Sequence, residues 1–181
     1  MRIAITGGIA EGKSTVLGYI ADLGHLTASA DQIAREVFDD PFTNQKIAEL
    51  IGASDTATRA AVREAIARSD DVRREINALT HPQIHHRIMA SQATFIEVPL
   101  LIEACVQGCF DQVWVVTCGP EEQRRRLSAR HSNPAQVDAL LKLQLPTSAK
   151  TPFSDQLIRT NMDSDLVRGI VELSVTAVLD T

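Results

Sequence analysis

Short apolar runs alternate along this chain with longer segments of helical periodicity. The runs predict buried strands at residues 3–5, 26–30, 94–98, 113–117 and 157–159. Between them, apolar residues recur at intervals of three and four, which is typical of helices that bury one face. Strands and helices that alternate in this way predict an α/β fold, with a parallel core sheet and helices on both of its faces.

Two segments depart from that alternation. Helical periodicity is continuous over residues 38–92, so we expect an inserted helical lobe there, with a kink or a restart at Pro82. Residues 131–154 are irregular and hold three prolines, and we expect a mobile helical lid there. The remainder forms the core of a single domain, at about residues 1–37, 93–130 and 155–181.

The first and last helices can be assigned more closely. The first is expected to end at Gly24, because glycine is favoured just beyond a helix C-terminus. The last begins near Ser164, and its periodicity predicts four residues facing the core: Leu166, Ile170, Leu173 and Ala177.

Composition and charge exclude several classes of protein. The 181 residues are 44% apolar and 23% charged, as in globular domains rather than disordered or fibrous chains. A net charge of −5 argues against a large nucleic-acid footprint, which needs fields of lysine and arginine. No apolar run approaches the roughly 20 residues that span a bilayer, and no signal-peptide pattern opens the chain. We expect a cytoplasmic protein that binds neither nucleic acid nor membrane; composition leaves its oligomeric state open.

The most informative motif follows the first predicted strand. Residues 7–14 read GGIAEGKS and match the phosphate-loop pattern GxxxxGK[ST] in the strand–loop–helix context that this motif requires. Its backbone N–H groups and the helix N-terminus attract phosphate oxygens. Lys13 is expected to reach the β- and γ-phosphates, and Ser14 to ligate Mg²⁺. The motif predicts ATP binding by these residues: Gly8, Ala10, Glu11, Gly12, Lys13, Ser14 and Thr15.

Glu11 is an unusual residue for such a loop. A carboxylate beside a triphosphate is repulsive. We therefore expect the Glu11 side chain to point outward to solvent.

One aspartate and two arginines are further candidates for chemistry. Asp31 lies where the second strand meets a helix, so it can accept a hydroxyl proton or hold a Mg²⁺-bound water; the alternative is a helix N-cap. Arg126 and Arg130 are four residues apart on a predicted helix and share one face. That face can neutralise a transferring phosphate or stack on adenine, whereas the alternative is a solvated basic surface.

Cysteine and histidine do not form a recognisable metal site. The cysteines are odd in number, without a second cluster, and are interpreted as reduced structural thiols: Cys105, Cys109 and Cys118. A histidine cluster around Pro82 lacks a third ligand at metal-binding spacing, and contact with solvent or substrate is favoured for its members: His81, His85 and His86.

Taken in order, these motifs resemble the dephospho-coenzyme A kinase family, whose members use ATP to phosphorylate the ribose 3′-hydroxyl of dephospho-coenzyme A. The resemblance spans nearly the whole chain. It rests on TGGIAEGKST at 6–15, SADQIAR at 29–35, LTHPQI at 79–84, VPLLIE at 98–103, the spacing of Gln123, Arg126 and Arg130, Gln144 with Lys150, and SDQLIRTN at 154–161.

The resemblance implies a three-layer phosphate-loop kinase fold and a role for each matching residue. Asp31 would be the general base or the orienter of the attacking hydroxyl, and Lys13 would stabilise the γ-phosphate. Arg126 and Arg130 would lie near the nucleotide under the lid, and Asn161 near the adenine. The acceptor, dephospho-coenzyme A, would contact Asp31, Arg35, His81, Pro99, Leu100 and Leu101, with Mg²⁺ accompanying ATP.

Three positions depart from the residues usual in that family. Ala10 and Glu11 stand where a glycine and a serine are usual, and Ser29 stands where an aspartate is usual. The carboxylate missing at Ser29 predicts slower catalysis or a higher demand for Mg²⁺.

Two other functions remain as alternatives. One is another small-molecule kinase of this fold, acting on a nucleoside or nucleotide, which a panel of acceptors would separate. The other is an ATP-sensing module that has lost catalysis, suggested by Glu11 and Ser29. It predicts ATP binding without acceptor-dependent release of ADP.

Overall fold

The computed structural model describes residues 1–180, which form two compact units. One unit contains Met1–Ser29 and the chain from Gln92 onward, and the other contains Ala30–Ser91. We describe them separately as the α/β unit and the helical unit.

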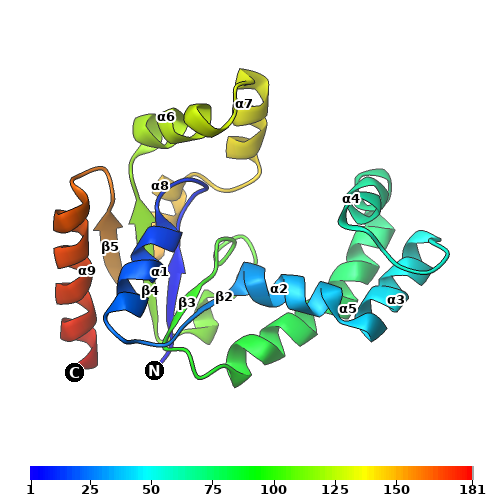
Figure 1. The fold of residues 1–181 in the computed structure, drawn as a ribbon, viewed down its shortest axis with the longest axis horizontal. Helices are drawn as coiled ribbons and strands as arrows, with labels where there is room; N and C mark the ends of the chain where they lie inside the picture. The colour runs from blue at the N-terminus through cyan, green and yellow to red at the C-terminus, as the bar shows by residue number, and fades with distance from the viewer. Residues whose placement is uncertain (181) are drawn as a thin grey trace. The chain divides into compact units, whose positions relative to one another are not determined.

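A parallel sheet forms the centre of the α/β unit (Figure 1). Its strands are β1 (Ile3–Thr6), β2 (Thr27–Ser29), β3 (Phe95–Glu97), β4 (Gln112–Thr117) and β5 (Gln156–Arg159). In the described part of the chain they lie in the order β2-β3-β1-β4-β5, and every neighbouring pair is parallel. Since parallel strands require crossover connections, helices must lie between them in sequence. The predicted α/β fold with a parallel core sheet is confirmed.

Helices α1 (Lys13–Asp22) and α9 (Ser164–Leu179) pack together and share one apolar core with the sheet. Alternate strand residues such as Ile3 and Ile5 face this core, where Phe95 and Trp114 meet edge to face at 5.3 Å. The intervening residues point to the opposite face and are buried as well. Helix α8 (Thr147–Lys150) contacts β4.

The predicted inward face of the last helix is wrong. The buried residues of α9 are Val167, Val171 and Val175, whereas Leu166 is 62% exposed and Leu173 is 73% exposed. Ile170 is half-buried and Ala177 exposed. Two apolar stripes on this helix have helical spacing, and the β-branched valine stripe is the one that packs on the sheet.

The remaining helices of the α/β unit follow β3 and β4. They are the short helix η1 (Gln107–Cys109), then α6 (Pro120–Arg130), α7 (Pro134–Lys142), α8, and the short helix η2 (Thr151–Phe153). Helices α6 and α7 contact each other.

The helical unit has an apolar core of its own. It contains α2 (Ala30–Asp39), α3 (Pro41–Ile51), α4 (Arg59–Arg68) and α5 (Asp70–Ala90). The core comprises Ile47, Ala48, Ala57, Val62 and Ile76. Helix α5 continues through Pro82, so the restart expected there does not occur. Within residues 1–180, no helix combines the length and the apolarity needed to cross a bilayer.

Candidate active site

The loop between β1 and α1 has a backbone that only glycine permits at two positions. Gly7 has φ of 148°, and a Cβ there would lie 2.2 Å from the carbonyl oxygen of Val116. Gly12 has φ of 95°, and its Cβ would lie 3.0 Å from Oγ1 of Thr160. The loop is therefore pressed between the ends of β4 and β5, and a side chain at either glycine would displace it.

The loop delivers the N-terminus of α1 without a capping side chain. Its first i to i−4 bond runs from Val16 N to Gly12 O at 3.0 Å, so the N–H groups of Lys13, Ser14 and Thr15 have no acceptor within the helix. Lys13 is 7% exposed and donates from Nζ to Gly8 O at 2.9 Å. The N–H groups at a helix N-terminus, the helix dipole and an ammonium group together favour a bound anion.

A groove leads from this helix end along the sheet edge. A cavity of about 100 Å³ is lined by Ala10, Gly12, Lys13, Ser14, Thr15 and Arg130. It shares lining residues with a second of about 310 Å³, which reaches Arg126, Thr160 and Met162. Those three residues also line a third cavity of about 750 Å³, which extends to Asn161 and the 118–122 segment. Because neighbouring cavities share lining residues, we call the three together the groove, and the phosphate loop and Asn161 both line it.

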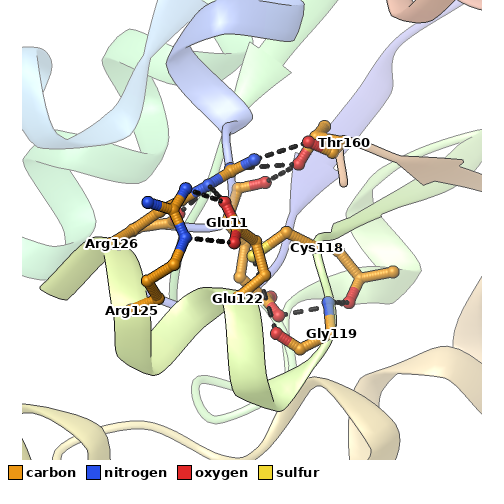
Figure 2. Close-up of polar contacts among 9 residues, drawn as sticks. Glu11, Cys118, Gly119, Glu122, Arg125, Arg126 and Thr160 are labelled. Carbon is orange, nitrogen blue, oxygen red and sulfur yellow. Dashed lines mark hydrogen bonds and ion pairs between the residues drawn. The ribbon is translucent and has the colours of Figure 1, made fainter. Parts of the chain in front are cut away.

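Arg126 lines the two larger of these cavities and is held by polar contacts with its neighbours (Figure 2). Its Nε donates to Oε1 of Glu122 at 2.8 Å, and its Nη2 donates to Thr160 O at 2.5 Å. A weaker bond reaches Ala10 O at 3.4 Å. Since three segments of the chain hold it, the guanidinium is in place before a ligand binds.

Glu122 also pairs with the exposed Arg125, at 2.6 and 2.7 Å. The hydrogen bonds from Arg125, and then from Arg126, lower the pKa of Glu122 to about 2. Glu122 therefore stays ionised at any ordinary pH.

The other predicted nucleotide residues differ in how firmly they are held. Arg130 is exposed and lines the cavity at the loop, and Asn161 is exposed and lines the cavity of about 750 Å³. Arg124 is exposed as well and pairs with Asp138 of α7 at 2.7 Å. Leu127, which is also on α6, is buried.

The predicted outward orientation of Glu11 is wrong. Glu11 is 1% exposed, and its carboxylate accepts from Gly8 N at 2.6 Å, from Oγ1 of Thr117 at 3.1 Å, and from Oγ1 of Thr147. Its backbone carbonyl accepts from Oγ1 of Thr160 at 2.7 Å. Hydrogen bonds to neutral donors satisfy this buried carboxylate, which the argument from charge repulsion did not consider.

Helix α8 supplies a second buried polar contact. Lys150 is fully buried, donates to Pro99 O at 2.8 Å and pairs with Glu103 at 2.8 Å. Burial raises the pKa of Glu103 and is the largest single influence on it, but the hydrogen bonds from Lys150 and from backbone N–H groups, together with the charge of Lys150, hold this pKa below its ordinary value. The segment after β3 is thereby joined to α8.

One pair of oxygen donors near the loop has the chemistry of a magnesium site. The hydroxyl of Ser14 donates to Oε1 of Glu97 at 3.5 Å, at the carboxyl end of β3. Mg²⁺ prefers hydroxyl, carboxylate and water oxygens. Glu97 pairs in register with Ile5 on one side and Ser29 on the other, so position 29 lies beside it at the sheet edge.

The predicted acceptor residues are divided between the two units. Asp31 and Arg35 lie on α2 and His81 on α5, all three exposed. Asp31 is the second residue of α2 and follows β2 by two positions. Pro99 and Leu101 are buried in the α/β unit, where Leu100 is 47% exposed.

Sequence reasoning missed three residues that the structure brings to the groove. Thr160 contacts the loop, Thr147 contacts Glu11, and Glu122 holds Arg126. Only Glu122 carried a signal, because it precedes Arg126 by four residues on one helix face.

Comparison with known proteins identifies close relatives of the whole chain. Residues 1–165 match the family described as dephospho-CoA kinase. The dephospho-CoA kinase of Moorella thermoacetica is 32% identical, with 93% of this chain and 88% of that protein aligned. The dephospho-CoA kinase of Escherichia coli strain K12 is 33% identical with the same coverage of both chains.

Solved structures share the fold. TT1252 from Thermus thermophilus superposes with a TM-score of 0.84 at 24% identity, covering 99% of this chain and 96% of that one. Dephospho-CoA kinase from Campylobacter jejuni gives 0.73 at 22% identity, covering 98% and 96%. Shikimate kinase from Acinetobacter baumannii gives 0.53 at 15% identity, covering 99% and 93%. The fold is therefore that of phosphate-loop kinases.

Proposed function

The chain belongs to the dephospho-CoA kinase family, and from this premise we propose that it transfers the γ-phosphoryl group of ATP to the ribose 3′-hydroxyl of dephospho-coenzyme A. The family match agrees with the resemblance carried by the sequence motifs, and it makes the chain a phosphotransferase. ADP and coenzyme A are the products, so the reaction is the last step of coenzyme A synthesis. The proposed location is the cytoplasm, where both substrates are expected.

The phosphate loop with Lys13 is the observation that carries this proposal. The N–H groups at the start of α1 and the Lys13 ammonium supply positive charge where the β- and γ-phosphates would bind. Arg126 lies farther along the same groove and would neutralise charge that develops during transfer. Asn161, which lines the cavity of about 750 Å³, is proposed to lie near the adenine.

Mg²⁺ fits the oxygen donors at the loop. Ser14 and Glu97 are the proposed protein groups, Ser14 as a ligand and Glu97 as a carboxylate that accepts from it or from a water of the ion. Held by these groups beside the phosphates, Mg²⁺ would supply positive charge that offsets the phosphate charge repelling a nucleophile. With serine at position 29, Glu97 is the carboxylate at this point of the sheet edge.

The acceptor hydroxyl needs a group that orients it and takes its proton. Asp31 is the proposed base, and it is exposed at the first turn of α2. Arg35, His81 and the 99–101 turn are the proposed contacts for the rest of the acceptor. Residues 131–154, which contain α7 and α8, are the proposed lid, since excluding water from the site prevents hydrolysis of ATP.

The direct test is ADP release from Mg-ATP with and without dephospho-coenzyme A, with mass spectrometry and phosphorus NMR of the acceptor product. We expect ADP release that depends on the acceptor and one added phosphate on the ribose 3′-oxygen. Release of ADP without a phosphorylated product, or faster turnover of a nucleoside in an acceptor panel, would contradict the proposal. Binding of ATP with no ADP released would favour the ATP-sensing alternative.

A further inference from the structure

Glu11 joins the phosphate loop to a distant helix. Its carboxylate accepts the Gly8 N–H of its own loop and the Thr147 hydroxyl of α8, which is 136 residues away in sequence. Gly8 N also approaches Oγ1 of Thr147 at 3.1 Å. Gly8, Glu11 and Thr147 thus form a closed hydrogen-bonded ring, which we name the Glu11 ring.

Every member of the Glu11 ring is buried. Glu11 is 1% exposed, Thr147 is 8% exposed and Gly8 is buried. A Cβ on Gly8 would lie 2.9 Å from the Glu11 carboxylate and 3.0 Å from the Thr147 hydroxyl, so the contacts are close-packed. Opening the ring therefore leaves polar groups without partners in a space that admits no larger side chain.

The ring acts on the loop at a point that matters for phosphate binding. Gly8 O accepts from Nζ of Lys13, so the contacts that hold the Gly8 N–H act one residue backbone away from the acceptor of this lysine. Gln123 reinforces the next peptide, because its Nε2 donates to Ile9 O at 2.9 Å. The loop conformation thus depends on side chains from α8 and α6 as well as on its own glycines.

Helix α8 is itself held at both ends. Thr147 begins the helix at the Glu11 ring, and Lys150 ends it on Pro99 O and Glu103. A shift of α8 would therefore disturb the loop through Thr147. This helix lies in the segment 131–154, which also contains α7.

We propose that Glu11 and Thr147 are positioning residues that set the phosphate loop in its ATP-binding conformation and couple it to α8. Neither residue touches the transferred phosphate; each acts through Gly8 and, from there, through Lys13. The inference rests on the proposed function only in taking ATP as the ligand. It reverses the expectation from charge alone, because removing the carboxylate should weaken ATP binding rather than strengthen it.

The test is a double-mutant cycle of Glu11→Ser and Thr147→Val, read out as the Kd of a non-hydrolysable Mg-ATP analogue by calorimetry. Serine is too short to replace both carboxylate contacts, and valine keeps the shape of threonine without its hydroxyl. We expect each variant to raise Kd by about tenfold, as loss of a hydrogen bond to a charged group implies. The Kd of the double variant should be little higher than that of the single variant with the higher Kd, because both substitutions open the same ring.

Conservative variants separate positioning from charge and from folding. Glu11→Gln and Thr147→Ser keep the hydrogen-bonding groups and should retain the wild-type Kd within about threefold. The matched control is Thr176→Val on α9, whose exposed hydroxyl donates to Glu172 O within its own helix; its Kd should not change. Thermal unfolding of each variant shows whether it is folded, and Thr147→Val carries the test if Glu11→Ser is not.

Three results would overturn the proposal. They are tighter binding by Glu11→Ser, unchanged Kd in folded Thr147→Val, and losses that multiply in the double variant. Turnover of the wild-type protein with dephospho-coenzyme A is measured alongside. If that turnover is absent while the Kd losses are coupled, the proposed function fails and the Glu11 ring stands.

Discussion

The α/β unit and the helical unit prepare their candidate residues differently. In the α/β unit, Lys13 and Arg126 are held by hydrogen bonds to the protein itself. In the helical unit, Asp31, Arg35 and His81 are all exposed. A preorganised side chain loses little freedom when its ligand binds, whereas an exposed one must be ordered at that moment. Substitutions on the nucleotide side should therefore alter ATP binding, whereas substitutions on the acceptor side should alter acceptor binding or turnover and leave ATP binding unchanged.

Lys13 offers the largest expected effect. Lys13→Ala removes the ammonium group at the start of α1, and kcat/KM should fall by at least about 10³-fold, because transition-state charge loses its stabiliser. The measurement is steady-state ADP release. Lys46→Ala, an exposed lysine on α3, is the control and should leave ATP affinity and turnover unchanged. A loss of kcat/KM below tenfold in Lys13→Ala would contradict the role proposed for the preorganised residues of the α/β unit.

Substitution of Asp31 tests the acceptor side of the proposed reaction. Asp31→Asn keeps the shape but cannot accept the hydroxyl proton, so kcat should fall by roughly 10²- to 10⁴-fold. The Kd for a Mg-ATP analogue should stay within about twofold, since ATP needs no contact with a general base. Glu36→Gln on the same helix is the control. An Asp31 variant that loses ATP affinity in proportion to turnover would contradict the division of roles.

Arg126 and Arg125 are adjacent arginines that both bond to Glu122. Only Arg126 also bonds to Thr160 and Ala10. It lines the cavity of about 310 Å³ beside the loop, whereas Arg125 lines only the cavity of about 750 Å³ among the three described above. Arg126→Ala should lower kcat/KM by roughly 100-fold. Arg125→Ala should change it by less than about threefold, because exposed ion pairs contribute little. Equal losses of kcat/KM in the two variants would contradict a specific role for Arg126.

The contribution of Glu122, which bonds to Arg126, to the free energy of unfolding should depend on pH. Its pKa of about 2 lies below the ordinary 4.5, so its contribution to stability is present above pH 4.5 and is lost as the pH falls toward 2. The difference in free energy of unfolding between wild type and Glu122→Gln should be constant from neutral pH down to about 5 and shrink below that. Urea unfolding at stepped pH measures it. If this difference in free energy of unfolding stays constant down to pH 3, or is already absent at pH 6, the lowered pKa of Glu122 is contradicted.

Ala10 should give the smallest effect. Its φ of 62° lies in the left-handed region, which glycine adopts without steric cost. Ala10→Gly should therefore raise the free energy of unfolding by about 0.5–1 kcal/mol, measured by urea denaturation. The control is Ala129→Gly in α6, which should lower it by a similar amount. Destabilisation at position 10 would show that Ala10 contributes contacts which outweigh its backbone strain.

The sequence predicts those elements that are formed by one continuous stretch of chain and match a known motif. The strand, glycine loop and helix from Ile3 to Asp22 could be assigned because the motif and its context occupy one continuous stretch. Gly24 followed from helix-end preferences in the same way, since it lies just beyond α1 with φ of 89°. In α9 the same reasoning chose the wrong stripe, because the spacing is equal for leucine and valine positions and only packing on the sheet decides.

Glu11 shows what local reasoning cannot reach. Its hydroxyl donors, Thr117 and Thr147, are 106 and 136 residues away in sequence, so no nearby residue indicated that a carboxylate could be satisfied inside the loop. Repulsion between the Glu11 carboxylate and the triphosphate was the sole basis for the expected outward orientation. The roles of Asp31, Arg130 and Asn161 stay predictions that rest on the family resemblance and on their positions in the fold.

Hydrogen–deuterium exchange measured by peptide mass spectrometry tests the division between the two units most directly. With a non-hydrolysable Mg-ATP analogue alone, slower exchange is expected in residues 7–15, 118–126 and 160–162 and none in 30–91. Dephospho-coenzyme A alone should slow exchange within 30–91 and around 99–101. Protection of 30–91 by the nucleotide alone, or no protection there by the acceptor, would contradict the account.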